Sequence, residues 1–349
     1  MTANYFLLAG AVLGLLLLPF VPALSEWLRP TDFAPLPMRR DQPNSLTFFA
    51  NGFRSRLVEQ HGVDLDALRT AGDAYEIPVS KALSVGRDIR TLERDQQKAL
   101  ARALGKANHI VLFRGSAWLG RDSRVRADLY VERDFEAGAG TQLRACLAEG
   151  KVRLGEKAEV QRWVHGRQVH LMANSRVAGR VTAEHFVCFA APARFERAGA
   201  PSVVFGDVAD TPKPVPMPQP VASRQVLDGD AEIGHDSTLA GDYVVRGNCR
   251  VTGEVALEGS IKSHGDLHVG EGARVIGSLS ARKNMEIGAG SAILGPLIGF
   301  EDIVLGPNCR IGRPDAPTTL VCNRLFVSPG CIVHGVITTH EGARFAAAA

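Results

Sequence analysis

The chain of 349 residues is poor in cysteine, in aromatic residues and in excess charge of either sign. Its six cysteines form no Cys-x-x-Cys pair, which excludes a disulfide-stapled scaffold and gives no zinc motif. The 40 Lys and Arg nearly balance the 37 Asp and Glu, so charge provides no reason to expect a nucleic acid partner. The sequence also lacks a Gly-rich phosphate loop, a nucleophile elbow and a metal-ligand motif. We therefore expect no enzyme, no cofactor, and neither catalytic nor metal-binding residues.

One long apolar run, residues 5–24, stands near the N-terminus and contains no charged residue. At 1.5 Å per residue it matches a hydrocarbon layer of about 30 Å, and it predicts a single transmembrane helix. A cleaved signal peptide is the alternative, because residues 21–23 resemble a cleavage site, but the preceding residues 1–4 carry no Lys or Arg. Arg29, Arg39 and Arg40 follow the run, so the positive-inside rule places the body in the cytoplasm, on the inner (cytoplasmic) membrane.

Between this anchor (1–30) and residue 107 the sequence indicates a tether followed by short helices. Prolines before residue 45 favour an extended tether, and helical spacing of apolar residues predicts helices over 46–60, 64–72 and 92–104. We interpret them as a spacer or cap that packs on whatever follows.

The decisive feature is a repeat of 18 residues between 231 and 340. Leu267-x-Val269-Gly270 recurs as Met285-x-Ile287-Gly288 and as Ile303-x-Leu305-Gly306. The register holds for six turns and is broken only by four extra residues after Ile311. Apolar pairs two residues apart start every six residues, which predicts three short strands per turn with one face buried. The pattern is that of a parallel β-helix, with glycine at corners that need positive φ.

A weaker copy of the pattern, at an offset of 17, runs from about 117 to 188 and predicts a first β-helical segment over 108–206 of about five turns. A Pro-rich linker (207–224) separates it from the second segment, 225–349. The predicted fold class is therefore all-β, a parallel β-helix in two segments, with an N-terminal transmembrane helix and a small helical region.

Cysteine positions agree with a reducing compartment. Cys188, Cys249, Cys309 and Cys331 are expected to point inward, where a free thiol behaves as a small hydrophobic side chain. Cys309 and Cys331 should occupy one column in successive turns. Such buried thiols fit the cytoplasm.

The corner motif [LIV]-G-x-G-[AS]-x-[VI] and its variants carry a family resemblance. VGEGARV at 269–275, IGAGSAI at 287–293 and LGPNCRI at 305–311 resemble the bactofilins, over residues 231–340. The resemblance implies a right-handed β-helix that joins end to end into filaments, often at a membrane, as a scaffold. We therefore expect a membrane-anchored, self-associating scaffold whose partners are itself, the membrane and envelope-associated proteins.

A hexapeptide-repeat acyltransferase with a left-handed β-helix is the alternative interpretation. Its general base would be His264, in the corner KSHGD. The glycines of the second face, Gly277 and Gly295, are displaced by one place from the hexapeptide form, which disfavours this reading.

The last turn of the repeat, residues 325–339, poses a problem of hydrogen bonding. No further turn follows it, and the remaining HEGARFAAAA contains one large apolar residue, Phe345. We expect this open edge to pair with another subunit, although the helix at 92–104 could cover it instead. The candidate self-assembly residues are Leu325, Val327, Ile337 and Phe345.

Overall fold

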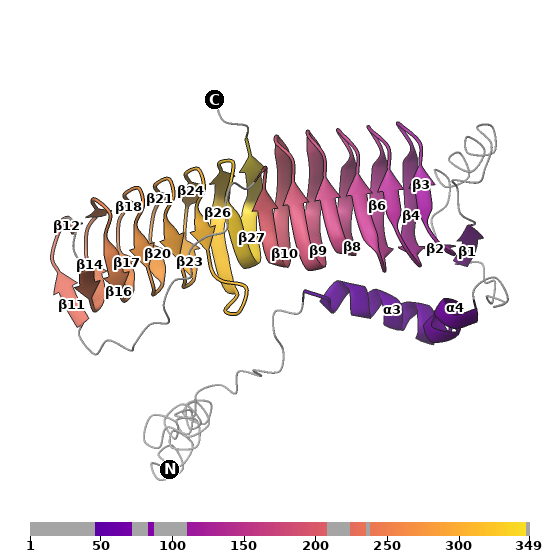
Figure 1. Ribbon diagram of the computed structural model, residues 1–349, viewed down its shortest axis with the longest axis horizontal. Helices are drawn as coiled ribbons and strands as arrows, with labels where there is room; N and C mark the ends of the chain where they lie inside the picture. The colour runs from indigo at the N-terminus through magenta and orange to yellow at the C-terminus, as the bar shows by residue number, and fades with distance from the viewer. Residues whose placement is uncertain (1–45, 72–82, 87–109, 208–223, 235–237, 347–349) are drawn as a thin grey trace, which may run out of the picture. The chain divides into compact units, whose positions relative to one another are not determined.

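The computed structural model describes residues 46–71, 83–86, 110–207, 224–234 and 238–346 (Figure 1). The chain separates into two units, 1–45 and 46–349, and every described residue belongs to the second. The predicted transmembrane helix at 5–24, the tether before residue 45 and the predicted helix at 92–104 lie outside the described residues. Of the helices that are described, none combines the length and the apolar character needed to cross a bilayer.

The described chain is an all-β parallel solenoid of about 12 turns accompanied by two short helices. α3 (Phe48–His61) and α4 (Leu65–Ala71) confirm two of the three predicted helices. They pack on the first solenoid segment, where Phe53 and Leu57 share a buried cluster with Leu112, Tyr130 and Leu147. α3 ends at Gly62, which adopts the left-handed conformation (φ 65°) common at helix C-termini.

The first segment begins where β1 (Leu83–Gly86) pairs with β2, and each later strand pairs in parallel with a strand of the next turn. The strands are β2 (Ile110–Phe113), β3 (Ala117–Leu119), β4 (Arg124–Val131), β5 (Phe135–Ala137), β6 (Gln142–Ala148), β7 (Lys151–Leu154), β8 (Glu159–Leu171), β9 (Ser175–Phe189) and β10 (Ala193–Phe205).

The second segment repeats the arrangement with shorter strands, and its turns are also paired in parallel. The strands are β11 (Arg224–Leu227), β12 (Ala231–Ile233), β13 (Thr238–Ala240), β14 (Asp242–Val245), β15 (Cys249–Val251), β16 (Ala256–Glu258), β17 (Ile261–Ser263), β18 (Leu267–Val269), β19 (Arg274–Val275), β20 (Leu279–Ala281), β21 (Met285–Ile287), β22 (Ala292–Ile293), β23 (Leu297–Gly299), β24 (Asp302–Leu305), β25 (Arg310–Ile311), β26 (Thr318–Val327) and β27 (Ile332–Phe345).

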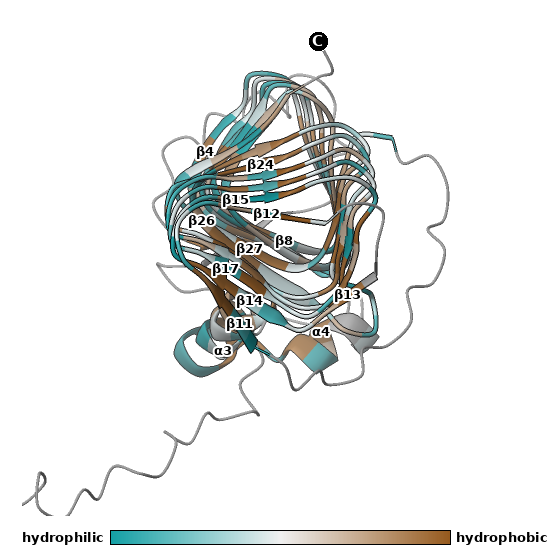
Figure 2. Ribbon diagram, turned by 90° about the vertical axis from the view of Figure 1, so that its left-hand side faces the viewer, coloured by the Kyte–Doolittle hydropathy of each residue, from teal (hydrophilic) through white to brown (hydrophobic). Residues whose placement is uncertain are grey.

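The 18-residue periodicity is confirmed as the determinant of the core. Val251, Val269, Ile287 and Leu305 are direct neighbours in successive strands, and all four are buried. Seen along the coil, hydrophobic and hydrophilic residues alternate on the strands (Figure 2). The extra residues after Ile311 raise the spacing to 22, since Ile303 pairs with Leu325, and a turn over 313–316 accommodates them.

Cys188 was predicted to point inward, and this was wrong. In β9 the buried side chains are Val187 and Phe189, and Cys188 lies between them on the outer side, partly exposed. The pairing offset between β8 and β9 changes from 17 to 18 at a bulge between Gly166 and Gln168. One added residue reverses the face of every later side chain in a strand, and a constant offset of 17 therefore fails here.

A column of aspartate and asparagine side chains holds one corner of the second segment. Each residue accepts a hydrogen bond from the backbone amide 18 residues later: Asp230 from Asn248 at 2.8 Å, Asn248 from Asp266 at 2.9 Å and Asp266 from Asn284 at 3.1 Å. The contacts with Asn248 keep the pKa of Asp230 below its usual range. The column satisfies backbone donors that the short strands leave unpaired.

A column of glycines forms another corner because the backbones approach too closely for a side chain. A Cβ atom added to Gly259, Gly277 or Gly295 would overlap the carbonyl oxygen of the glycine 18 residues earlier. Gly290 differs, since it has a positive φ of 68° but open space around its missing Cβ. The predicted reason for corner glycines, positive φ, therefore applies to only some of them.

The two segments are joined end to end by their final strands (Figure 1). β10 and β27 pair in the antiparallel direction, so the last turn of the second segment is closed by the last turn of the first. The expectation that the turn at 325–339 presents an open edge was therefore wrong. Periodicity describes contacts between consecutive turns, and this contact joins residues that are 128 to 152 positions apart.

We predict that Gly277→Ala destabilises the solenoid by about 3 kcal/mol or more, because the methyl group would have to displace backbone. Gly290→Ala should cost only about 1–2 kcal/mol, the price of a left-handed alanine. Thermal unfolding followed by circular dichroism measures both. Equal melting temperatures for the two variants would contradict the close-approach explanation.

Candidate functional site

The joint between β10 and β27 is the most unusual feature of the solenoid. The two strands pair over three stretches separated by two register shifts, with Ala193 opposite Phe345, Ala198 opposite Ile337 and Val204 opposite Ile332. Because the pairing is antiparallel while all pairing within each segment is parallel, the C-terminal ends of the two segments face each other.

Aromatic packing fills the interior of the joint. Phe189, Phe195 and Phe205 stack with centroid distances of 4.5 to 5.9 Å, and Phe345 contacts Phe205 edge-on at 5.5 Å. All four rings are buried. Phe205–Phe345 is the ring pair that crosses the joint, and a pair of this geometry is worth about 0.5–1.5 kcal/mol beyond burial.

Polar side chains complete the joint where its strands bend. The Thr339 hydroxyl donates to the Glu196 carbonyl at 2.6 Å, and His334 Nδ1 lies 2.9 Å from the Pro201 carbonyl. A carbonyl only accepts, so Nδ1 carries a proton. Burial lowers the pKa of His334, which favours the neutral ring in this position.

The four predicted self-assembly residues lie inside this region and not at a free surface. Leu325 and Val327 belong to β26, which pairs with β24 on one side and with β27 on the other. Ile337 and Phe345 belong to β27 and are 0% and 1% exposed. Their contacts in the structure are within one chain. Their role in contacts between chains stays a prediction, now without the open edge on which it was based.

The second segment is a coil with 18 residues per turn, and its corners are formed by glycines and by Asp/Asn side chains. Its terminal strand, β27, pairs along its edge with β10. Residues 231–338 match the family model of bactofilin, described as polymer-forming cytoskeletal. This confirms the resemblance drawn from the corner motif and assigns a bactofilin domain to the second segment. Neither a curated protein nor a solved structure is similar enough to the chain to count as a match.

The bactofilin domain contains the histidine considered for acyl transfer. His264 is exposed in the corner between β17 and β18, and its backbone amide donates to the Val245 carbonyl at 2.9 Å. The histidine that faces a carboxylate is instead His268, whose Nδ1 lies 3.1 Å from Glu286 Oε2 in the next turn. Sequence reasoning missed this pair, although their separation of 18 residues could have revealed it. Both side chains are exposed, as in an ordinary cross-strand pair.

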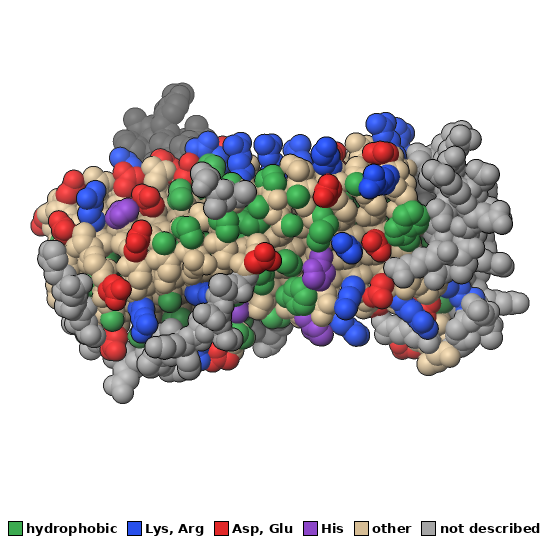
Figure 3. Space-filling view, turned by 45° about the horizontal axis from the view of Figure 1, so that its top comes forward, with side chains coloured by type: hydrophobic (Ala, Val, Ile, Leu, Met, Phe, Trp, Pro, Cys, Tyr) green, Lys and Arg blue, Asp and Glu red, His purple; other side chains and the backbone are tan. Residues whose placement is uncertain are grey.

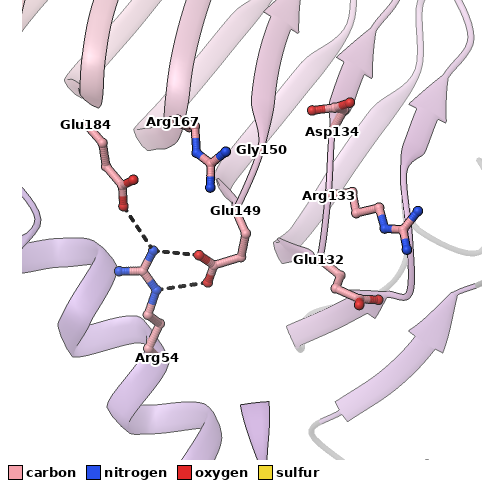
Figure 4. Close-up of a pocket in the computed structure, with 8 residues that line it drawn as sticks. All are labelled: Arg54, Glu132, Arg133, Asp134, Glu149, Gly150, Arg167 and Glu184. Atoms are coloured by element: carbon pink, nitrogen blue, oxygen red, sulfur yellow. Dashed lines mark hydrogen bonds and ion pairs between the residues drawn. The ribbon is translucent and has the colours of Figure 1, made fainter. Parts of the chain in front are cut away.

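A polar cavity of about 800 Å³ lies beside α3, away from the bactofilin domain (Figure 4). Arg54 of α3 donates two hydrogen bonds to Glu149, at 2.8 and 2.9 Å, and lies 3.6 Å from Glu184. Glu132 accepts from the Gly115 amide, and Asp134 accepts from the Lys151 amide. These carboxylates are therefore engaged in holding α3 and two turns, and we interpret the cavity as an anchoring contact for the helix. It is lined by Arg54, Glu132, Arg133, Asp134, Glu149, Gly150, Arg167 and Glu184.

A buried histidine lies behind this contact. His165 Nδ1 is 2.8 Å from the Thr182 hydroxyl, and Nε2 is 3.9 Å from Glu184. Burial, together with the nearby Arg54, lowers the pKa of His165 to about 4. The ring is thus neutral at physiological pH, which suits a packed structural residue.

Three cysteines of the bactofilin domain point inward as predicted. Cys249, Cys309 and Cys331 are buried, and Cys309 and Cys331 occupy neighbouring positions in successive turns. The Cys309 thiol donates to the Gly288 carbonyl, and the Cys331 thiol donates to the Gly306 carbonyl. The contact with Cys331 and burial raise the pKa of Cys309, and burial raises the pKa of Cys249 to about 11. The thiols of Cys249 and Cys309 therefore stay protonated.

An arginine row crosses the outer surface of the joint. Arg176, Arg194 and Arg344 are direct neighbours in β9, β10 and β27, and all three are exposed. Lys and Arg side chains also gather along one edge of the molecule (Figure 3). Like charges directly opposite one another in a sheet repel, so the row favours an anionic partner.

We predict that Phe345→Ala loosens the joint, because it removes a buried ring from the aromatic cluster, at a cost of about 3–5 kcal/mol. Hydrogen exchange of the β27 amides should become faster. Phe300→Ala is the matched control, since Phe300 is 69% exposed in the same domain. Unchanged β27 exchange in Phe345→Ala would contradict the role of this ring in closing the joint.

Proposed function

We propose that this protein is a membrane-anchored, self-associating scaffold that localises envelope or surface-assembly proteins without catalysing a reaction. The observation that carries the proposal is the match of residues 231–338 to a polymer-forming cytoskeletal family on a β-solenoid. A solenoid repeats the same outer surface every turn, which suits a protein that presents many equivalent positions to partners.

Anchoring to the inner membrane, with the body in the cytoplasm, is the second part of the proposal. The uncharged run at 5–24 supports a membrane anchor, and the arginine row at the joint supports contact with an anionic surface. All six cysteines are free, and Cys309 and Cys331 are neighbours, which supports a reducing compartment.

Two differently tagged copies of the full chain, expressed together, should co-purify from the membrane fraction. In the variant Leu15→Arg/Leu16→Arg they should co-purify from the soluble fraction, because two charges at the centre of a membrane helix cost about 5–7 kcal/mol on insertion scales. The experiment thereby reads anchoring and self-association separately.

Val304→Arg is the control, since it adds a charge at an exposed position of the bactofilin domain and should leave the chain in the membrane fraction. Failure of the two tags to co-purify in any fraction would contradict self-association. An unmodified chain found in the soluble fraction would contradict the anchor.

A further inference from the structure

The two ends of the bactofilin domain differ in the structure. The C-terminal end is closed by β10 of the same chain. At the N-terminal end β11 pairs with β14 and β12 pairs with β15, and within the described ranges no strand pairs with the outer edge of either. An exposed strand edge with unused donors and acceptors is a template for another strand.

The side chains of β11 show that this edge also leaves apolar surface uncovered. Leu227 lies over the buried Val245 and is only partly covered itself, whereas Val226 points outward and is 52% exposed. In later turns of the second segment, the preceding turn covers the corresponding inward position, as Leu227 covers Val245 and Val245 covers Ser263. The first turn therefore has a place for one more layer of strands.

The joint inside the chain shows what such a layer looks like. There, two solenoid ends of the same polarity meet through antiparallel pairing of β10 and β27. A twofold axis between two copies produces the same arrangement, because an edge strand that pairs with its own copy across a twofold axis is antiparallel to it.

Side-chain alternation restricts the register of such a pair. Directly opposed residues must lie on the same face of the sheet, so the axis passes through a residue and not between two. With the axis at Val226, this side chain packs on its own copy, and Arg224 faces Asp228 of the second copy. This register brings Arg224 to a carboxylate that also lies 2.9 Å from Arg246 of its own chain, so that two guanidinium groups face each Asp228.

We propose that the chain assembles through β11 into a closed dimer with twofold symmetry, and that the first solenoid segment prevents addition of further copies at the C-terminal end. The partner is a second copy of this chain. The inference rests on the proposed function, because it specifies how the scaffold self-associates. An isologous contact of this kind closes on itself, whereas head-to-tail contacts continue into filaments.

The variant Val226→Cys tests the register in the full chain, in detergent. Directly opposed residues of an antiparallel pair have Cβ atoms about 4.5–5.5 Å apart, near the separation that a disulfide bridges with small shifts. Mild oxidation should therefore give a covalent dimer. Ile298→Cys is the matched control, because Ile298 lies in the same outward column four turns away and should not cross-link. The unmodified chain, with its six cysteines, gives the background.

Charge exchange provides a second test that needs no cross-link. Arg224→Asp should weaken the dimer by roughly tenfold, since the axis places two Arg224–Asp228 contacts in each dimer. Because Asp228 also contacts Arg246 of its own chain, the double variant Arg224→Asp/Asp228→Arg is compared with Asp228→Arg, which loses that contact too. The double variant should bind its copy more tightly than Asp228→Arg, and equal or weaker binding would contradict the register.

The mass of the full chain at tens of micromolar distinguishes the possible failures. A dimer that Val226→Asp converts to a monomer supports the proposal. Filaments, or a dimer indifferent to substitution at Val226, would overturn it and leave the self-associating scaffold intact. A monomeric unmodified chain would overturn the scaffold function itself.

Discussion

Backbone hydrogen bonding between turns is the constraint on which this structure depends. In a solenoid each turn satisfies its donors and acceptors against the turns on either side, so only the ends remain unsatisfied. Within each turn the corners are held by features repeated every 18 residues, such as the Asp230–Asn248–Asp266 column and the glycines at 259, 277 and 295. The backbone groups of the interior turns are therefore paired within the solenoid, and the unpaired groups at its ends are the ones available to other molecules.

The chain resolves one of these ends internally. β10 supplies to β27 the strand pairing that a further turn would give, and Phe345 inserts beside Phe205 to continue the core. The first segment therefore closes the C-terminal end of the bactofilin domain. Arg54 holds α3 to the first segment through its ion pair with Glu149. α3 and the first segment thus lie on the side of the closed end of the bactofilin domain, while β11 lies at its opposite end.

The repeated apolar columns could be predicted from the sequence, whereas the bulge in the first segment and the joint between the segments could not. The columns of Val269, Ile287 and Leu305 follow directly from the spacing, because alternation and an 18-residue period determine which side chains point inward. Cys188 was misplaced because a bulge changes the offset by one residue. The joint could not be found in this way, since periodicity contains no information on which two distant ends meet. The Asp/Asn column also recurs every 18 residues, but its residues are polar, and the alternation of apolar side chains gives no sign of it.

The central claim is that the C-terminal end of the bactofilin domain is closed within one chain. Arg194 and Arg344 are directly opposed across the joint and exposed, so the double variant Arg194→Cys/Arg344→Cys can be oxidised without disturbing the core. The account predicts a disulfide within one chain, detected by mass spectrometry of a cross-linked peptide pair in a product that runs as a single chain on non-reducing gels. A product in which the same two cysteines link different chains would show that the joint forms between molecules, and would contradict the account.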